Sequence, residues 1–108
     1  MRIGFEKRGR TLYARLVGEL DEYCAAELRS RIDEEIRGAG ALSTLVLDLS
    51  GVSFMDSSGI GVVLGRYRLM RSLGGEIAIV GASPRVESLM RMSGVYTLIE
   101  KTAGGGAR

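Results

Sequence analysis

The chain has 108 residues, enough for one domain with a hydrophobic core of its own. Hydrophobic residues make up 45% and charged residues 26% of the sequence, which indicates a folded globular chain. There is no histidine and a single cysteine, Cys24. This composition excludes a Ser-His or Cys-His nucleophile pair, an internal disulfide and a cysteine zinc cluster. We therefore expect a protein that is not an enzyme, with no catalytic residues, no metal site and no cofactor.

The charge pattern argues against two classes of partner. The net charge is only +2, and no broad basic face with interleaved aromatic residues is visible, so nucleic-acid binding is not predicted. The compact group of Arg66, Arg68 and Arg71 is interpreted as a solvated helix face. Residues 1–6 contain no apolar signal segment, and no apolar run approaches the length of a membrane span. We expect a cytoplasmic protein that does not bind a membrane.

The N-terminal third predicts a β-hairpin followed by a helix. Residues 2–7 and 11–17 are strand-like, and a tight turn at residues 8–10 joins them. Asp21 is the predicted N-cap of a helix that ends near Gly38. Apolar residues at helical spacing give this helix one buried face.

The middle of the chain predicts two buried strands on either side of a second helix. Residues 44–49 form a short, nearly continuous apolar run, which is typical of a central strand covered on both faces. A loop is predicted at residues 50–56 and a helix at residues 57–72. Gly74 follows the helix as a C-terminal turn residue, and residues 76–80 are the next strand.

The C-terminal part predicts a third helix and a short edge strand. Ser83 and Pro84 are a capping residue and a first-turn proline, and the helix is expected to stop near Ser93. Residues 95–99 are β-prone, and the glycine-rich residues 102–108 are expected to be a flexible tail. The order of elements is β-β-α-β-α-β-α-β, which predicts a single α/β domain with right-handed crossovers.

Two strand-to-helix junctions are the candidate functional loops, at residues 18–23 and 50–61. In sheets of this kind, binding surfaces collect where strands end and helices begin. If their strands are adjacent, the two loops lie side by side. We therefore expect the functional surface at this end of the sheet.

The serine-rich start of the second helix allows several interpretations. In the simplest, Asp56, Ser57 and Ser58 only cap the helix. Three glycines follow a strand in a loose dinucleotide-binding pattern, Gly59, Gly61 and Gly65, but the next strand lacks the acidic residue that would hold a ribose. These glycines are more simply explained by a close approach of the helix to the sheet and a flat surface for a partner. A serine hydrolase is not predicted, because the chain offers no residue to act as the general base. The remaining alternative is a serine that another enzyme modifies. The spacing alone does not choose between Ser57 and Ser58.

Residues 53–67, SFMDSSGIGVVLGRY, resemble the phosphorylation-site motif of bacterial anti-sigma factor antagonists, which belong to the STAS domain family. Further similarities occur in the same order at residues 17–21, 74–76, 83–84 and 92–94, so the resemblance covers almost the whole chain. It implies a single STAS-like domain over residues 1–101. Its expected structure is a four- to five-stranded mixed sheet with helices packed mainly on one face.

The family resemblance also implies a function and a set of site residues. An anti-sigma factor with serine kinase activity would phosphorylate Ser57, and a serine phosphatase would reverse the modification. The unphosphorylated form would bind the anti-sigma factor and free a sigma factor for sporulation transcription. The residues implied in partner binding are Asp21, Asp56, Ser57, Ser58, Gly59 and Gly61. Alternatives are a stress-response sigma pathway, a signalling scaffold or a nucleotide-binding module.

Overall fold

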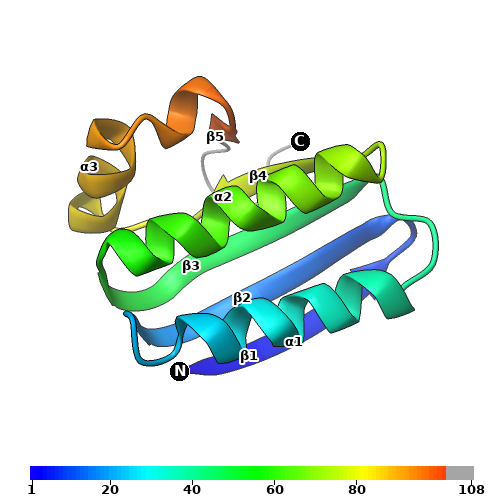
Figure 1. Cartoon of the computed structure of the whole chain (residues 1–108), viewed down its shortest axis with the longest axis horizontal. Coiled ribbons are helices and arrows are strands. Elements are labelled where there is room, and N and C mark those ends of the chain that lie inside the picture. The colour runs from blue at the N-terminus through cyan, green and yellow to red at the C-terminus, as the bar shows by residue number, and fades with distance from the viewer. Residues whose placement is uncertain (102–108) are drawn as a thin grey trace.

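The computed structural model describes residues 1–101, which form one mixed five-stranded sheet with the strand order β1-β2-β3-β4-β5 (Figure 1). The prediction of a flexible tail at residues 102–108 lies outside the described residues. The five strands are β1 Arg2–Arg8, β2 Thr11–Leu20, β3 Thr44–Met55, β4 Glu76–Val80 and β5 Glu100–Lys101. β1 and β2 are an antiparallel hairpin, turned at Gly9 with φ 59°. All later neighbours are parallel, as the alternation of strands and helices predicted.

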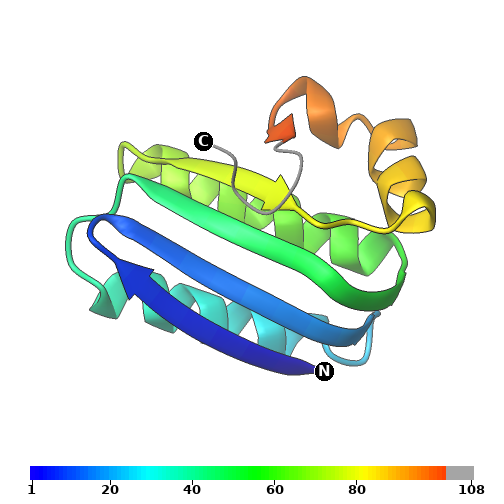
Figure 2. The same cartoon turned by 180° about the vertical axis from the view of Figure 1, so that it is seen from behind.

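Two long helices cover one face of the sheet, and the opposite face carries no helix (Figure 2). They are α1, Ala25–Gly38, and α2, Ser57–Ser72. The shorter helix α3, Pro84–Met92, lies at the end of the sheet where α2 begins (Figure 1). It is capped by Ser83, whose Oγ accepts a hydrogen bond from the Val86 amide, as the Ser83–Pro84 pair predicted. The expected α/β domain, with a mixed sheet and helices mainly on one face, is confirmed.

The core lies between the sheet and the two long helices. Alternate residues of each strand point toward the helices, because successive side chains of a strand point to opposite faces. Fully buried examples are Leu12 and Leu16 on β2, and Leu45 and Leu47 on β3. The helices contribute residues at helical spacing, which are Leu28, Ile32 and Ile36 of α1 and Ile60, Val63 and Met70 of α2. This is the periodicity that predicted both helices.

Four elements differ from the prediction, β2, β3, α1 and the edge strand β5. β2 extends to Leu20, and β3 extends to Met55 through the predicted loop, because the two strands stay paired beyond residue 17 with shifts in register. Cys24 occupies the N-cap position of α1, so Asp21 is not the helix cap. Residues 95–97 form a 3-10 turn, η1, and the edge strand β5 begins only at Glu100.

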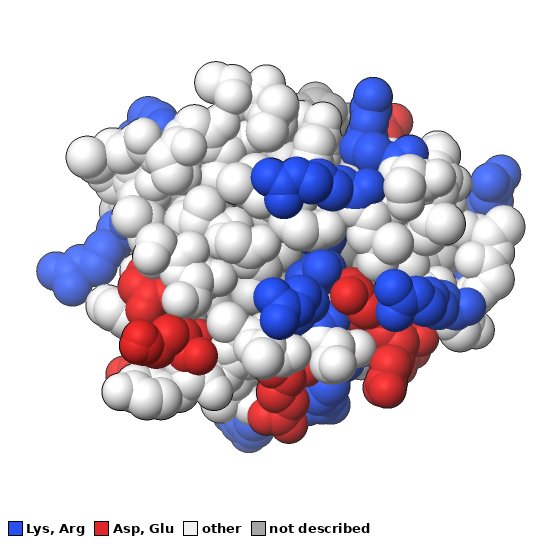
Figure 3. All heavy atoms as spheres, viewed as in Figure 1, with Lys and Arg blue, Asp and Glu red and all other residues white. Residues whose placement is uncertain are grey.

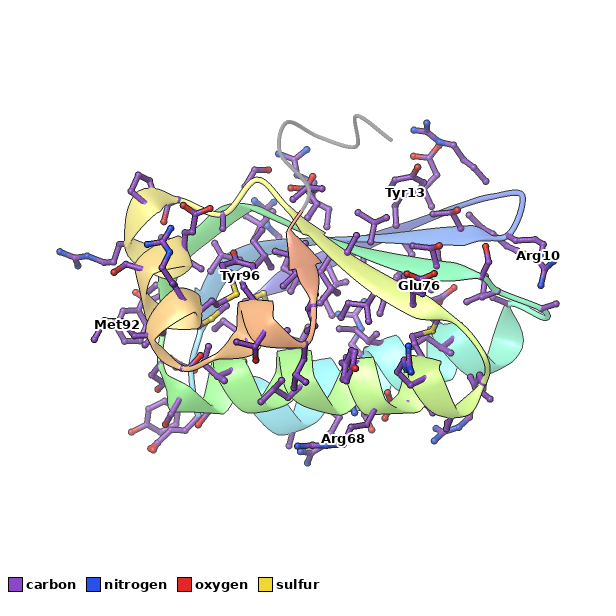
Figure 4. The ribbon with its side chains drawn as sticks, turned by 90° about the horizontal axis from the view of Figure 1, so that it is seen from above. Arg10, Tyr13, Arg68, Glu76, Met92 and Tyr96 are labelled. Carbon is purple, nitrogen blue, oxygen red and sulfur yellow. The ribbon has the colours of Figure 1, made fainter. Side chains whose placement is uncertain are left out.

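One arginine of the predicted solvated cluster is buried. Arg66 is 4% exposed and its Nε lies 2.7 Å from Asp33 Oδ1, so an ion pair joins α2 to α1. Burial lowers the pKa of Arg66 below its usual value, and Asp33 opposes that effect. Arg68, by contrast, points away from the sheet on the outer side of α2 (Figure 4), so the interpretation as a solvated face is correct for Arg68 and wrong for Arg66.

Candidate functional site: the β2–α1 and β3–α2 junctions

The first turn of α2 distinguishes its two serines. Asp56 is the N-cap in extended conformation, and its Oδ1 accepts a hydrogen bond from the Ser58 amide at 2.8 Å. The Asp56 carbonyl accepts from the amides of Gly59 and Ile60. Ser57 is the first helical residue and is exposed, whereas Ser58 is half-buried. The cap is therefore the aspartate, and the hydroxyl of Ser57 is free to meet a partner.

The β2–α1 junction is a tight turn organised by Asp21. Its Oδ1 accepts hydrogen bonds from the amides of Tyr23 at 3.0 Å and Cys24 at 3.3 Å, and its carbonyl accepts from the amides of Cys24 and Ala25. The Cys24 thiol, which is half-buried, donates to the Glu19 carbonyl. Asp21 thus stabilises the turn before the helix, and these hydrogen bonds fix the orientation of its carboxylate. The role of Asp21 in partner binding stays a prediction.

The two junctions are held side by side, as the adjacency of their strands predicted (Figure 1). The register places Leu20 opposite Met55, and the Asp56 amide donates to the Leu20 carbonyl at 3.3 Å. Gly59 then lies directly over Leu20. A Cβ at position 59 would overlap the Leu20 side chain and lie 2.6 Å from Met55 Cγ. Because Gly59 has no side chain, the first turn of α2 packs closely against Leu20, next to the Asp21 turn.

The three glycines of α2, Gly59, Gly61 and Gly65, differ in their packing. Only Gly59 is needed for close packing against the sheet. An added Cβ at Gly61 or Gly65 would meet no atom within 4 Å. The expectation that all three glycines bring the helix close to the sheet is therefore wrong for Gly61 and Gly65. Glycine in an exposed helix costs about 0.5–1 kcal/mol relative to alanine, and packing within the described chain gives no reason for that cost at Gly61.

The surface around the two junctions is acidic and partly aromatic. Asp21 and Asp56 lie on it with the exposed Glu19 and Glu22, and Figure 3 shows acidic side chains gathered where α1 begins. Two large apolar side chains are exposed nearby, Tyr23 at 91% and Phe54 at 42%. Sequence reasoning missed both, although an aromatic residue within two positions of each aspartate was a usable signal. Exposed aromatic residues beside fixed charges are typical of protein-binding surfaces.

The described part of the chain offers little else for chemistry. Among residues 1–101, no group of three or more His, Cys, Asp or Glu side chains is placed to hold a metal ion. None of the helices within these residues combines the length and the hydropathy that crossing a lipid bilayer requires. The arrangement presents the exposed Ser57 and the exposed Gly61 beside the Asp21 turn, which its hydrogen bonds hold in place.

The fold and this junction define the class of protein, and the STAS domain model matches residues 2–104. The chain belongs to the STAS domain family. It is 39% identical over 92% of its length to the anti-sigma F factor antagonist of Paenibacillus polymyxa, covering 84% of that protein. It is 31% identical to the anti-sigma-B factor antagonist of Bacillus subtilis, with 83% of each chain covered. The resemblance predicted from the motifs is confirmed.

The solved structures of a related antagonist have the same fold. The structure of the anti-sigma factor antagonist SpoIIAA in its unphosphorylated form matches with a TM-score of 0.79 and 33% identity, covering 94% of this chain and 88% of that one. SpoIIAA of Bacillus in its phosphorylated form matches with a TM-score of 0.71 and 32% identity, covering 94% and 91%. That relative therefore exists in both states with this fold.

Proposed function

We propose that the chain is a cytoplasmic anti-sigma factor antagonist that phosphorylation of Ser57 switches off. The unphosphorylated form binds an anti-sigma factor with serine kinase activity and frees the sigma factor. The kinase transfers the γ-phosphoryl group of ATP to Ser57 Oγ, and ADP and the hydroxyl proton leave. A serine phosphatase hydrolyses the phosphoserine and restores the binding form. The chain contributes a substrate hydroxyl to this cycle and no catalytic group.

The exposed hydroxyl of Ser57, beside the fixed Asp21 turn, is the observation that carries this proposal. A kinase must bring the acceptor oxygen within bonding distance of the γ-phosphorus, so the acceptor must protrude from its surroundings. Ser58 fits this requirement less well, because it is less exposed than Ser57. The relatives named as anti-sigma factor antagonists, with SpoIIAA solved in a phosphorylated form, support phosphorylation as the modification.

We infer that the pathway is that of a sporulation sigma factor. The higher identity to an anti-sigma F factor antagonist, 39% against 31% for an anti-sigma-B factor antagonist, supports this choice. The second candidate is a stress-response pathway, which the anti-sigma-B relatives favour. Copurification from the native cell separates the two, since the anti-sigma factor recovered with the Ser57→Ala chain identifies the sigma factor that is served.

Incubation with the cognate kinase and ATP is expected to modify Ser57 alone. Intact-mass spectrometry should show the gain of one phosphoryl group, and peptide mapping should place it on Ser57. Ser57→Ala should gain none, whereas the matched variant Ser58→Ala should still be modified. Stoichiometric phosphorylation of Ser57→Ala would show that the assigned site is wrong.

Gly61→Ala is expected to stabilise the fold and weaken the complex. The added methyl group has open space and raises helix propensity, so the free energy of unfolding should rise by about 0.5–1 kcal/mol. The same methyl group should hold the partner's surface away from α2 and weaken binding roughly tenfold, measured by calorimetry with the anti-sigma factor. Gly65→Ala is the matched control, with the same gain in stability and unchanged binding. Equal affinities of Gly61→Ala and the unsubstituted chain would exclude Gly61 from the interface.

A further inference from the structure

The outer side of β1 is an open sheet edge that the proposed switch does not use. β1 is the first strand in the sheet order, and its outer side faces no other strand within residues 1–101 (Figure 2). An unpaired strand edge presents N–H and C=O groups that can pair with a strand of another chain. α2 packs against β3 and β4, so a partner at this edge leaves Ser57 exposed.

β1 lacks the features that usually protect a strand edge. Protected edges are very short, or carry a proline, a bulge or an outward lysine. β1 has seven residues, none of them proline, and it pairs with β2 from Arg2 to Arg8 without a shift in register. Its one lysine, Lys7, donates a hydrogen bond from Nζ to the Ala39 carbonyl at 2.6 Å. The other edge strand, β5, is only two residues long, so β1 is the edge suited to pairing.

The hairpin fixes which backbone groups of β1 point outward. A two-residue turn joins β1 to β2, so Arg8 and Thr11, which flank the turn, are a hydrogen-bonded pair. Hydrogen-bonded and non-hydrogen-bonded pairs alternate along an antiparallel ladder. Every second residue back from Arg8 therefore bonds to β2, whereas Ile3 and Phe5 direct their N–H and C=O groups away from the sheet.

We propose that two copies of the chain associate through β1, as antiparallel strands centred on Gly4. The two-fold axis is perpendicular to the sheet, and the two sheets join into one. Ile3 of one copy lies opposite Phe5 of the other, so the outward N–H and C=O groups of both residues form hydrogen bonds. Arg2 lies opposite Glu6 of the second copy, and symmetry repeats this pair.

The charges of β1 favour this register over its neighbours. Opposite charges at directly opposed positions of two strands stabilise the pairing, and like charges destabilise it. A register centred on Phe5 places Arg2 opposite Arg8. The registers centred on the next two residues place Glu6 or Lys7 opposite its own copy.

Arg2 and Glu6 are both available for such a pair. Arg2 is exposed and has no ion pair within residues 1–99, whose side chains the structure describes. Glu6 is exposed, and the hydrogen bond from Arg8 lowers its pKa, so it carries a negative charge at neutral pH. A register centred on Ile3 would leave both charges without a partner in the second copy.

The proposed register also covers the two apolar side chains of β1. Ile3 and Phe5 are half-buried and pack against the core on the helix side of the sheet. Ile3 lines a small hollow with Leu28 and Arg31 of α1, and Phe5 of the second copy lies next to it. Only residues 2–6 of each strand pair, so the interface is smaller than that of a permanent dimer. We expect a reversible dimer with a dissociation constant of about 0.1 mM.

Sedimentation equilibrium of the full chain between about 0.02 and 1 mM measures this association. Arg2→Glu alone and Glu6→Arg alone should each weaken the dimer at least about tenfold, because both charge pairs then become like-charged. An equimolar mixture of the two variants should associate as the unsubstituted chain does, since each variant meets opposite charges in the other. Arg85→Glu, at an exposed arginine of α3, changes the net charge as Arg2→Glu does and should associate normally.

Amide hydrogen exchange of the unsubstituted chain tests the register without a substitution. Exchange at Ile3 and Phe5 should slow as the protein concentration rises. Exchange at Gly4, whose amide already bonds to β2, should not depend on concentration. This measurement decides the question even where a variant does not fold, because constant exchange rates at Ile3 and Phe5 would overturn the proposal.

Three sedimentation results would also overturn the proposal. They are a monomer at about 1 mM, unchanged association of both single variants, and failure of their mixture to associate. Both variants should keep a thermal midpoint within about 5 °C of the unsubstituted chain, because the replaced side chains are exposed. Association lost in each variant and recovered in the mixture would support pairing of two copies through β1.

Discussion

Phosphorylation of Ser57 is expected to weaken the complex with the anti-sigma factor by about 100- to 1,000-fold, which corresponds to roughly 3–4 kcal/mol. The modification adds about −1.5 to −2 charges to a surface that already carries Asp21 and Asp56. In the product complex that the proposed cycle implies, the phosphoserine would also face the phosphates of ADP in the kinase. Like charges brought together across a desolvated interface cost several kcal/mol. The complex should therefore separate soon after the transfer.

The fold should survive the same modification. Ser57 is the first residue of α2, where the helix dipole and free amides favour an anion. We expect the thermal midpoint of the phosphorylated chain to stay within about 5 °C of the unmodified one, a change of about 1 kcal/mol or less. A large drop in the midpoint would show that the switch works through unfolding.

Calorimetry with the anti-sigma factor and ADP measures the effect on binding. The ratio of the two dissociation constants should shrink between 0.05 and 0.5 M salt, because salt screens repulsion between like charges (the screening length falls from about 14 to about 4 Å). Ser57→Ala should bind as the unmodified chain does and should change the free energy of unfolding by less than about 0.5 kcal/mol, because Asp56 and not Ser57 caps the helix. Equal affinities of the modified and unmodified chains would refute the switch.

The elements that the sequence predicted well are those with strong local signals. α2 was predicted from residue 57 to residue 72, and the structure has these bounds, because Asp56 caps it and glycines follow it. Ser83 and Pro84 predicted the start of α3 in the same way. The sequence predicted that the two junctions lie side by side only on the condition that their strands are adjacent, and the strand order meets this condition. The sequence did not predict that Ser57 is more exposed than Ser58, because this depends on which oxygen caps the helix.

The elements that the sequence did not predict depend on contacts between distant segments. Residues 50–55 contain serine and glycine and were expected to form a loop. They extend β3 because β2 supplies backbone partners as far as Leu20. Asp21 has the side chain of a helix cap, yet it caps the turn before α1. Arg66 lies between exposed arginines in the sequence, and only the packing of α1 against α2 buries it.

The largest expected effect on stability comes from the ion pair between Arg66 and Asp33. This pair joins α2 to α1, the two helices that carry the site. The Arg66 side chain is 5% exposed and that of Asp33 is 16% exposed. Arg66 also donates to the Val62 carbonyl at 3.4 Å. Removing one partner of a buried ion pair leaves the other charge without compensation, at a cost of about 3–5 kcal/mol. The partly exposed position of Asp33 places the expected loss at the lower end of this range.

Asp33→Ala should therefore lower the free energy of unfolding by about 3 kcal/mol, and the thermal midpoint by at least about 10 °C. Arg66→Met should cost less, because Asp33 can turn toward water while the methionine keeps the packing. The double variant Asp33→Leu/Arg66→Met should return to within about 1 kcal/mol of the unsubstituted chain, since an apolar pair of similar volume often replaces a buried ion pair without loss.

Chemical denaturation of the unsubstituted chain, Asp33→Leu, Arg66→Met and the double variant, analysed as a double-mutant cycle, gives the coupling energy between the two side chains. Arg68→Met is the control, because Arg68 lies on the outer side of α2 (Figure 4). It should change the free energy of unfolding by less than about 0.5 kcal/mol. If Asp33→Ala cost no more than this control, water would already reach the guanidinium of Arg66. The attachment of α1 to α2 would then depend on the apolar residues alone, because a solvated pair of this kind contributes at most about 1 kcal/mol.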